Sequence, residues 1–299
     1  MLETVINSII VTLLGTGTPG PRIDRFGPST LVEAGGLRLL FDCGRGTMQR
    51  IYQIDTDTSS FDKLFLTHLH SDHTTGIPDL WITRYIFIRL DTAKENTLRI
   101  WGPNGTKQML EHLAKAFEVD KKVRNELWGI PQDEGIRIEA YDIDEGFIFE
   151  ENGVKVVPFR VNHHDLYSDE PSLGYRIEYN DRSVVLSGDT RLCENLIRFS
   201  ENVDLLVHEV AAGPLGVSLP DSMKIPLAHH TLPEECGVVF SQVKPKLAVY
   251  HHIVQFQGVS LEEMMARTRK EYDGPVLFGE DLMRIEVGDS VKVLSSETR

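Results

Sequence analysis

The chain has 299 residues, 41% of them hydrophobic and 25% charged, a composition typical of globular proteins. Its formal net charge of −14 repels polyanions and disfavours nucleic acid as a partner. Three widely spaced cysteines without a C-x-x-C pair indicate neither a disulfide framework nor a thiolate zinc site, so any bound metal must use nitrogen and oxygen ligands.

The N-terminal part is predicted to be rich in strands. The segment MLETVINSIIVTLLGTG lacks the basic start and the small-residue cleavage site of a signal peptide, so its apolar part is interpreted as the first strand and we expect a cytoplasmic protein. No apolar run reaches the roughly 18 residues of a membrane helix, and no membrane partner is expected. A long Gly/Pro-rich loop, TGTPGPRIDRFGPS, leads to the strand LRLLFDCG, and KLFLT forms a further buried strand.

Residues 82–145 are predicted to form a partly helical insertion. Its apolar residues recur at helical spacing: Met109, Leu110, Leu113 and Phe117. This pattern predicts one amphipathic helix over GTKQMLEHLAKAFEVDKKVRNEL, and its basic residues are interpreted as a solvated face rather than a polyanion site.

The second half is predicted to alternate strands with few helices. VKVVPFRV, LGYRIEY and SVVLSGDT are strands, the last two joined by the tight polar turn NDRS. DLLVHEV, CGVVFSQV and KLAVYHHI follow as strand, helix and strand. No linker, low-complexity segment or repeat divides the chain, so we predict a single α/β domain over residues 1–299.

The histidines are concentrated at the ends of these strands. Ten of the 11 fall into five places: His68, His70 and His73; His163 and His164; His208; His229 and His230; and His251 and His252. Loops at the carboxyl ends of strands carry the chemistry of α/β sheets, so clusters far apart in the sequence can converge in space. His112 stands alone on the amphipathic helix and is interpreted as a surface residue.

The densest cluster is THLHSDHTTG, Thr67 to Gly76. His68 and His70 alternate just past the strand KLFLT, so in an extended backbone both imidazoles face one side and can hold one cation. Asp72 and His73 follow where the chain turns, at a neighbouring point. Imidazole and carboxylate ligands without thiolate suit zinc, with manganese or iron as substitutes, and a cluster of this kind suits two adjacent metals.

THLHSDHTTG resembles the H-x-H-x-D-H signature of the metallo-β-lactamase fold, a four-layer αβ/βα sandwich with a dinuclear site at one edge. The resemblance extends to the tRNase Z-like branch through motifs that occur in order along the chain: LLGTGTPGP, LLFDCGRGT, IWGPNGT, LGYRIEY, VVLSGDT, DLLVHE and AHHT. It implies that fold, with the helical insertion added, and a zinc-dependent hydrolase that binds two Zn²⁺ ions, for which Mn²⁺ or Fe²⁺ could substitute.

The resemblance also implies a ligand set. The first metal would be held by His68, His70 and one histidine of VNHHD. The second would be held by Asp72, His73 and one histidine of YHHI. Asp189 of SGDT would bridge the two ions, which would share a water whose pKa falls to about 7, giving a bridging hydroxide at neutral pH.

Each histidine doublet leaves two candidates for one ligand position. By its place after the strand PFRV we expect His163 rather than His164, and by the family's strand-then-histidine pattern we expect His252 rather than His251. The other member of each pair is expected to support the ligand or to be solvated.

His230 of AHHT and Glu209 of VHEV resemble a catalytic histidine and the carboxylate that orients it. Such a carboxylate raises the pKa of the imidazole, which can then donate a proton to a leaving oxygen. We predict that Asp72 is a catalytic residue as well. The alternative interpretation of His230 and Glu209 is a buried structural pair, while Asp42 and Thr67 are expected to support the metal loops.

One departure from the branch bears on the substrate. Its processing nucleases carry a long basic arm for tRNA between the strand of GYRI and the strand before SGDT, whereas this interval here is only EYNDRS. Together with the charge of −14, this favours small phosphodiesters over tRNA 3′ processing by an endoribonuclease. Lactones, carboxylic esters and sulfate esters remain alternatives, and an oxidoreductase or a noncatalytic metal-binding module would come from other classes. The sequence leaves a homodimer open.

Overall fold

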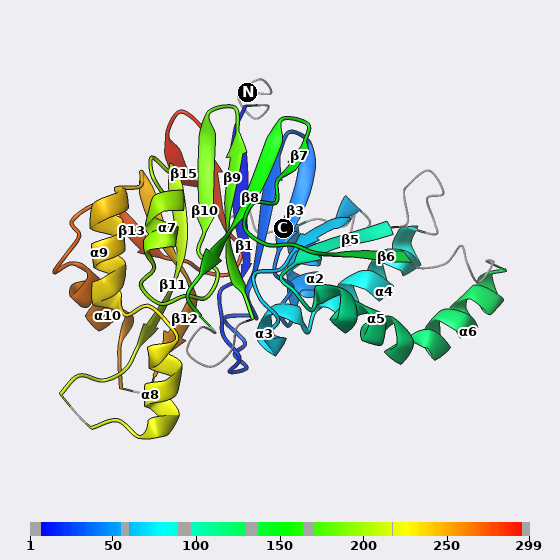
Figure 1. Cartoon of the computed structure of the whole chain (residues 1–299), viewed down its shortest axis with the longest axis horizontal. Helices are drawn as coiled ribbons and strands as arrows, with labels where there is room; N and C mark the ends of the chain where they lie inside the picture. The colour runs from blue at the N-terminus through cyan, green and yellow to red at the C-terminus, as the bar shows by residue number, and fades with distance from the viewer. Residues whose placement is uncertain are drawn as a thin grey trace.

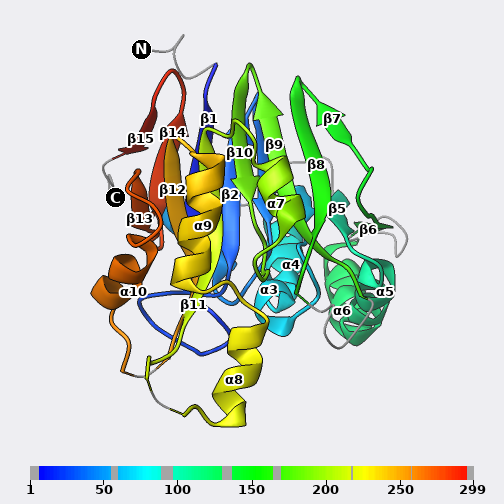
Figure 2. The same cartoon turned by 60° about the vertical axis from the view of Figure 1, so that its left-hand side comes forward.

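The computed structural model describes residues 7–54, 60–88, 97–129, 137–163, 170–216, 218–256 and 258–294. Two β-sheets face each other in these residues (Figures 1 and 2). The first has the strand order β15-β14-β1-β2-β3-β4-β5-β6 and the second the order β13-β12-β11-β10-β9-β8-β7. Among the described residues, no helix combines the length and the apolar character needed to cross a membrane.

The strands of the first sheet are β1 (Ile9–Gly15), β2 (Ser29–Ala34), β3 (Leu37–Phe41), β4 (Lys63–Phe65), β5 (Thr97–Gly102), β6 (Arg137–Asp142), β14 (Met283–Val287) and β15 (Val291–Leu294). Those of the second are β7 (Phe149–Glu151), β8 (Val154–Val161), β9 (Ser172–Tyr179), β10 (Arg182–Leu186), β11 (Leu205–Ala212), β12 (Leu247–Gln255) and β13 (Val276–Phe278). The helices are α2 (Thr47–Ile54), α3 (Ser71–Thr74), α4 (Ile77–Ile88), α5 (Thr106–Ala116), α6 (Glu118–Trp128), α7 (Glu194–Phe199), α8 (Asp221–Ala228), α9 (Pro233–Val243) and α10 (Leu261–Thr268).

Three hydrophobic clusters hold the layers together. The central one lies between the sheets and contains Val11 and Phe41 from the first sheet and Tyr175 and Val249 from the second. The other two lie on the outer faces, under α2, α4 and α5 on one side and under α7, α9 and α10 on the other. Both faces of the central strands are covered, so these strands are rich in buried apolar residues, and all eight residues of β11 are buried, His208 and Glu209 among them. The predicted four-layer αβ/βα sandwich is thereby confirmed.

Residues 82–145 differ from the insertion that the sequence predicts. The strands β5 and β6 continue the first sheet, β5 in parallel with β4 and β6 in parallel with β5, so much of this segment belongs to the sheet itself. The single predicted helix is two helices, α5 and α6, which meet at Phe117. The break turns the Phe117 ring toward Trp81 on α4, with ring centroids 6.3 Å apart.

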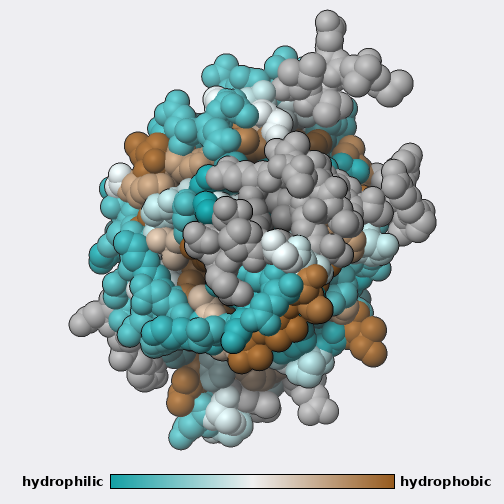
Figure 3. Space-filling view, turned by 90° about the vertical axis from the view of Figure 1, so that its right-hand side faces the viewer, coloured by the Kyte–Doolittle hydropathy of each residue, from teal (hydrophilic) through white to brown (hydrophobic). Residues whose placement is uncertain are grey.

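The end of the molecule that carries α5 and α6 is largely hydrophilic, with separate hydrophobic patches (Figure 3). Three apolar side chains of α6 are exposed: Val119, Val123 and Leu127. The helical spacing of apolar residues therefore predicts the buried face of α5, which contains Leu110, better than it predicts that of α6.

Parallel strands set the position of the chemistry. In the second sheet β10, β11 and β12 run parallel, and in the first sheet β3, β4 and β5 do so. The segments that leave the carboxyl ends of β4, β10 and β11 reach the edge of the sandwich at which α3 and α8 lie (Figures 1 and 2). A hydrogen bond joins the two sheets near this edge. The buried hydroxyl of Tyr175 on β9 donates to the carbonyl oxygen of Leu66, which follows β4, at 2.6 Å.

Candidate metal centre

Five segments bring histidine and aspartate side chains together at this edge. Their nitrogen and oxygen atoms form groups within which all atoms lie within 4.8 Å of one another. The first group is His68, His70, His163 and Asp189. The second is Asp72, His73 and His252, and a third contains Asp189, His230 and His252. All the ligand residues that the sequence predicts are thus near one another, although they come from both sheets.

In the first group, three ring nitrogens converge. The Nε2 atom of His68 lies 2.9 Å from Nδ1 of His70, and Nε2 of His163 lies 3.3 Å from the same atom. The Oδ2 atom of Asp189 is 3.8 Å from His68 and 3.9 Å from His163. His70 is exposed at this point and the other three residues are buried, so the group opens to solvent on the side of His70.

In the second group, the same oxygen of Asp189 faces two further imidazoles. It lies 3.3 Å from Nε2 of His252 and 3.4 Å from Nε2 of His73. Asp72 completes the group, with its Oδ2 atom 3.2 Å from His252 and 3.6 Å from His73. Asp189 is therefore between the two groups, as a carboxylate shared by two ions would be.

Asp42 determines which nitrogens of the first motif face the site. Its Oδ2 atom accepts a hydrogen bond from Nδ1 of His73 at 2.7 Å and another from the Thr67 hydroxyl at 2.8 Å. Because that hydroxyl has donated its proton to Asp42, it accepts from Nδ1 of His68, at 3.0 Å. In the neutral rings the Nε2 lone pairs of His68 and His73 are then left for the site.

Charge at the site favours a cation. Burial raises the pKa of Asp189, but the imidazoles of His252 and His73 lower it by more, so that it lies well below its ordinary value. Burial lowers the pKa of His73, whereas the carboxylates of Asp189 and Asp42 raise it well above its ordinary value. The imidazoles thus stabilise the buried negative charge of the carboxylates, and a divalent cation among the same atoms would stabilise it as well.

The residues present fit divalent ions. The Nε2 atom of His73 is buried and has no hydrogen-bond partner among the described residues. In the first group, Nε2 of His68 and Nε2 of His163 present lone pairs. The three ring nitrogens of this group nevertheless lie close to one another. Nitrogen and carboxylate donors without thiolate suit zinc and also manganese or iron.

The second histidine doublet is separated by a β-bulge. The register of β11 against β12 pairs Glu209 with His251 and Val210 with Ile253, so His252 is an extra residue, and its φ is 44°. The bulge turns His252 toward the second group. His251 instead lines a cavity of about 30 Å³ between the sheets, and its Nε2 atom lies 3.5 Å from the Thr30 hydroxyl. His163 lies in the first group, while His164 lies outside the described residues.

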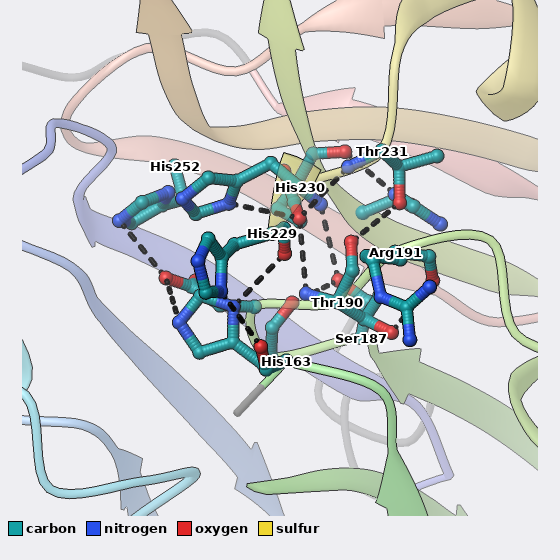
Figure 4. A network of polar contacts seen from close by, with 12 residues as sticks. His163, Ser187, Thr190, Arg191, His229, His230, Thr231 and His252 are labelled. Atoms are coloured by element: carbon teal, nitrogen blue, oxygen red, sulfur yellow. Dashed lines mark hydrogen bonds and ion pairs between the residues drawn. The ribbon is translucent and has the colours of Figure 1, made fainter. Parts of the chain in front are cut away.

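His230 lies beside His163 and His252 (Figure 4), and Glu209 orients it. Its Nδ1 atom lies 3.0 Å from Oε1 of Glu209. The same carboxylate oxygen accepts from the backbone N–H of Thr190 at 3.0 Å and of Thr231 at 3.2 Å. Burial lowers the pKa of His230, but the Glu209 carboxylate raises it by more, to about 9.

The sequence did not single out several supports of this pair. Thr190 directly follows Asp189, and its carbonyl oxygen accepts from the Thr231 hydroxyl at 2.6 Å. The hydroxyl of Ser187 accepts from the backbone N–H of Glu209 at 3.0 Å. The position of Ser187 and Thr190 around the SGDT motif was the only signal available. The side chain of His208 lies on the opposite face of β11 from that of Glu209, as strand alternation predicts; its Nδ1 atom donates to the Glu209 carbonyl oxygen at 2.6 Å, and its ring packs against Phe240 at 5.7 Å.

Two facing sheets with helices outside and a histidine–aspartate cluster at one edge define a metallohydrolase of the β-lactamase kind. The family model described as Beta-lactamase superfamily domain matches residues 37–253. A ribonuclease Z from Mycolicibacterium gilvum is 33% identical over 289 residues, covering 95% of this chain and 98% of its own length. A ribonuclease Z from Mycobacterium bovis is 34% identical and covers 93% of this chain and 98% of its own length. The chain therefore belongs to the β-lactamase superfamily of metal-dependent hydrolases, on the branch of the proteins named ribonuclease Z.

Solved structures agree on the fold. A metallo-β-lactamase fold protein from Bacillus subtilis superposes with a TM-score of 0.73 at 18% identity, covering 94% of this chain and 100% of its own. The short form of human tRNase Z has a TM-score of 0.65 at 21% identity, covering 92% of this chain and 98% of its own. At these identities the likeness extends to the fold alone.

The two members of the second doublet make a direct test of the site. His252→Ala is expected to lower the metal content of purified protein from about two ions per chain to about one, because the second group loses a nitrogen ligand. His251→Ala should leave the content unchanged, since that side chain faces the cavity between the sheets. Elemental analysis of protein purified without chelators measures both. Equal metal loss in the two variants would contradict the assignment.

Proposed function

We propose that this chain is a two-metal hydrolase of phosphodiesters, with compact phosphodiesters as its substrates. The first group would hold one ion and the second the other, with Asp189 shared between them. Bound there, two divalent ions would lower the pKa of a water to about 7 and supply a nucleophile at neutral pH. The observation that supports the proposal is the position of His230: a ring nitrogen of this residue lies within 4.8 Å of an oxygen of Asp189, and Glu209 raises its pKa to about 9.

The protein's own residues provide the acid for the departing group. Glu209 holds the Nδ1 side of His230, so the Nε2 atom is left to donate a proton to a leaving oxygen. Backbone N–H groups of Thr190 and Thr231 fix the carboxylate, and the imidazole therefore keeps one orientation. A phosphodiester has a poor leaving group, an alkoxide, and gains most from such a donor.

The hairpin of β9 and β10 supports a compact substrate. The strands pair directly from Tyr179 to Arg182 across a turn in which Asn180 and Asp181 have φ values of 47° and 58°. This is the left-handed backbone of a tight two-residue hairpin turn. No basic arm for a long polyanion can leave the sheet here, and the net charge of −14 acts in the same direction.

A second candidate is 3′ processing of tRNA, favoured by the names of the relatives. The ribonuclease Z of Mycolicibacterium gilvum aligns over 98% of its own length with 95% of this chain, so it has little room for a long arm that this chain lacks. The short hairpin therefore does not separate this chain from proteins of that name. This relationship counts against the expectation that nucleic acid is disfavoured as a partner.

A substrate panel distinguishes these functions. We expect a bis-nitrophenyl phosphodiester to be hydrolysed faster than a nitrophenyl carboxylic ester or a lactone, because these two lack the anionic oxygens that two cations would bind, and a nitrophenyl sulfate, which is also anionic, is assayed beside them. A tRNA precursor with a 3′ extension is assayed on the same preparation. Turnover of the ester or lactone without the diester would contradict the proposal, while rapid cleavage of the precursor alone would favour the second candidate.

His230→Ala separates proton donation from metal binding. The variant is expected to keep both metals and to lose about 10²–10⁴-fold in kcat on a diester with an alkyl leaving group. The loss should shrink with nitrophenolate, which departs without a proton, so the dependence of rate on leaving-group pKa becomes steeper. Glu209→Gln should show the same trend more weakly. Loss of metal, or one factor for all leaving groups, would make His230 a ligand or a structural residue.

A further inference from the structure

His163 and His229 are joined by two reciprocal hydrogen bonds (Figure 4). The Nδ1 atom of His163 lies 2.9 Å from the carbonyl oxygen of His229, and Nδ1 of His229 lies 2.9 Å from the carbonyl oxygen of His163. The two residues are 66 positions apart in the chain. A carbonyl oxygen only accepts, so both Nδ1 atoms must be the donors.

The pair has a direct consequence for the first group. With its Nδ1 proton donated to His229, a neutral His163 presents the Nε2 lone pair, and this atom faces Nδ1 of His70 at 3.3 Å. The side chain of His229 in return holds the backbone of His163 in place. One bond thus sets which nitrogen of His163 faces the site. The other fixes the backbone of His163, from which the ring extends.

Neighbouring bonds extend this connection to the proton donor. The backbone N–H of Asn162 donates to the Thr190 hydroxyl at 3.2 Å, and the Thr231 hydroxyl donates to the Thr190 carbonyl oxygen at 2.6 Å. His229 directly follows α8 and precedes His230. The segment of His163, the loop of Thr190 and the loop of His230 are consequently joined to one another.

We propose that His229 is a positioning residue that couples the metal ligand His163 to the proton donor His230. The inference rests on the proposed function for the role of His230. When His229 loses its ring, the His163 backbone is held less firmly and the loop of His230 loses its anchor. Both metal affinity in the first group and proton donation should then weaken together.

Asparagine and glutamine at position 229 make a matched pair. The side-chain amide nitrogen of Asn takes the place of the histidine Nδ1 and can still donate to the His163 carbonyl, whereas that of Gln lies nearer the place of Nε2. We expect His229→Ala and His229→Gln to weaken the binding of one of two zinc ions about 10–100-fold, the usual effect of losing a partner that orients a ligand. His229→Asn should stay close to the parent.

Zinc affinity is measured by competition with a chromophoric chelator, which needs no substrate and remains informative if the proposed function fails. Leaving-group dependence is measured at saturating zinc, and it should steepen in the Ala and Gln variants only. Thermal unfolding of the metal-free proteins checks that all three variants fold. A purely structural role predicts lowered melting temperatures without these changes. The proposal is overturned if Asn behaves like Gln, or if His229→Ala leaves zinc affinity unchanged.

Discussion

Buried carboxylates facing buried imidazoles are the constraint on which the rest of the site depends. Asp189 lies between two sets of ring nitrogens, and its negative charge cannot stay in the interior without a positive charge among them. Two residues of this arrangement have a left-handed backbone conformation: Asp42, with a φ of 58°, and His252, with a φ of 44°. Such conformations cost on the order of 1–3 kcal/mol each and persist where the surrounding structure over-determines them. Both residues are bound to the site that they build, Asp42 through Thr67 and His252 through Asp72.

The sandwich supplies the rigidity for this. The fully buried strand β11 pairs in parallel with β12, and the two strands bring Glu209 and His252 to the site. The first sheet delivers THLHSDHTTG to the same edge from β4. In the proposed function, metal binding and proton donation would be linked, because Thr190, next to Asp189, also donates to the carboxylate that orients His230. A relationship to proteins named ribonuclease Z fits a phosphodiester chemistry built on this pair of functions.

Local sequence patterns predicted much of the fold and of the histidine cluster. They failed where pairing between strands or contacts between distant residues determine the structure. The apolar runs KLFLT and DLLVHEV predicted buried strands, and the histidines after them predicted the cluster. The strands β2, β14 and β15 were missed; they form by pairing with β1 or with each other. The choice of His252 over His251 rests physically on a bulge whose register is invisible in sequence. The bonds between His163 and His229 join residues 66 positions apart, which no spacing rule reveals. The organisation of residues 1–299 as a single domain stays a prediction.

The most direct test of the account is a crystal structure of zinc-loaded protein with anomalous data collected at the zinc edge. The account predicts two peaks about 3.5–4 Å apart, one bound by His68, His70 and His163 and the other by the second group, with Asp189 bound to both. His230 should be close to the ions without binding either. A single peak, or His230 bound to a metal, would contradict the assignment of the site.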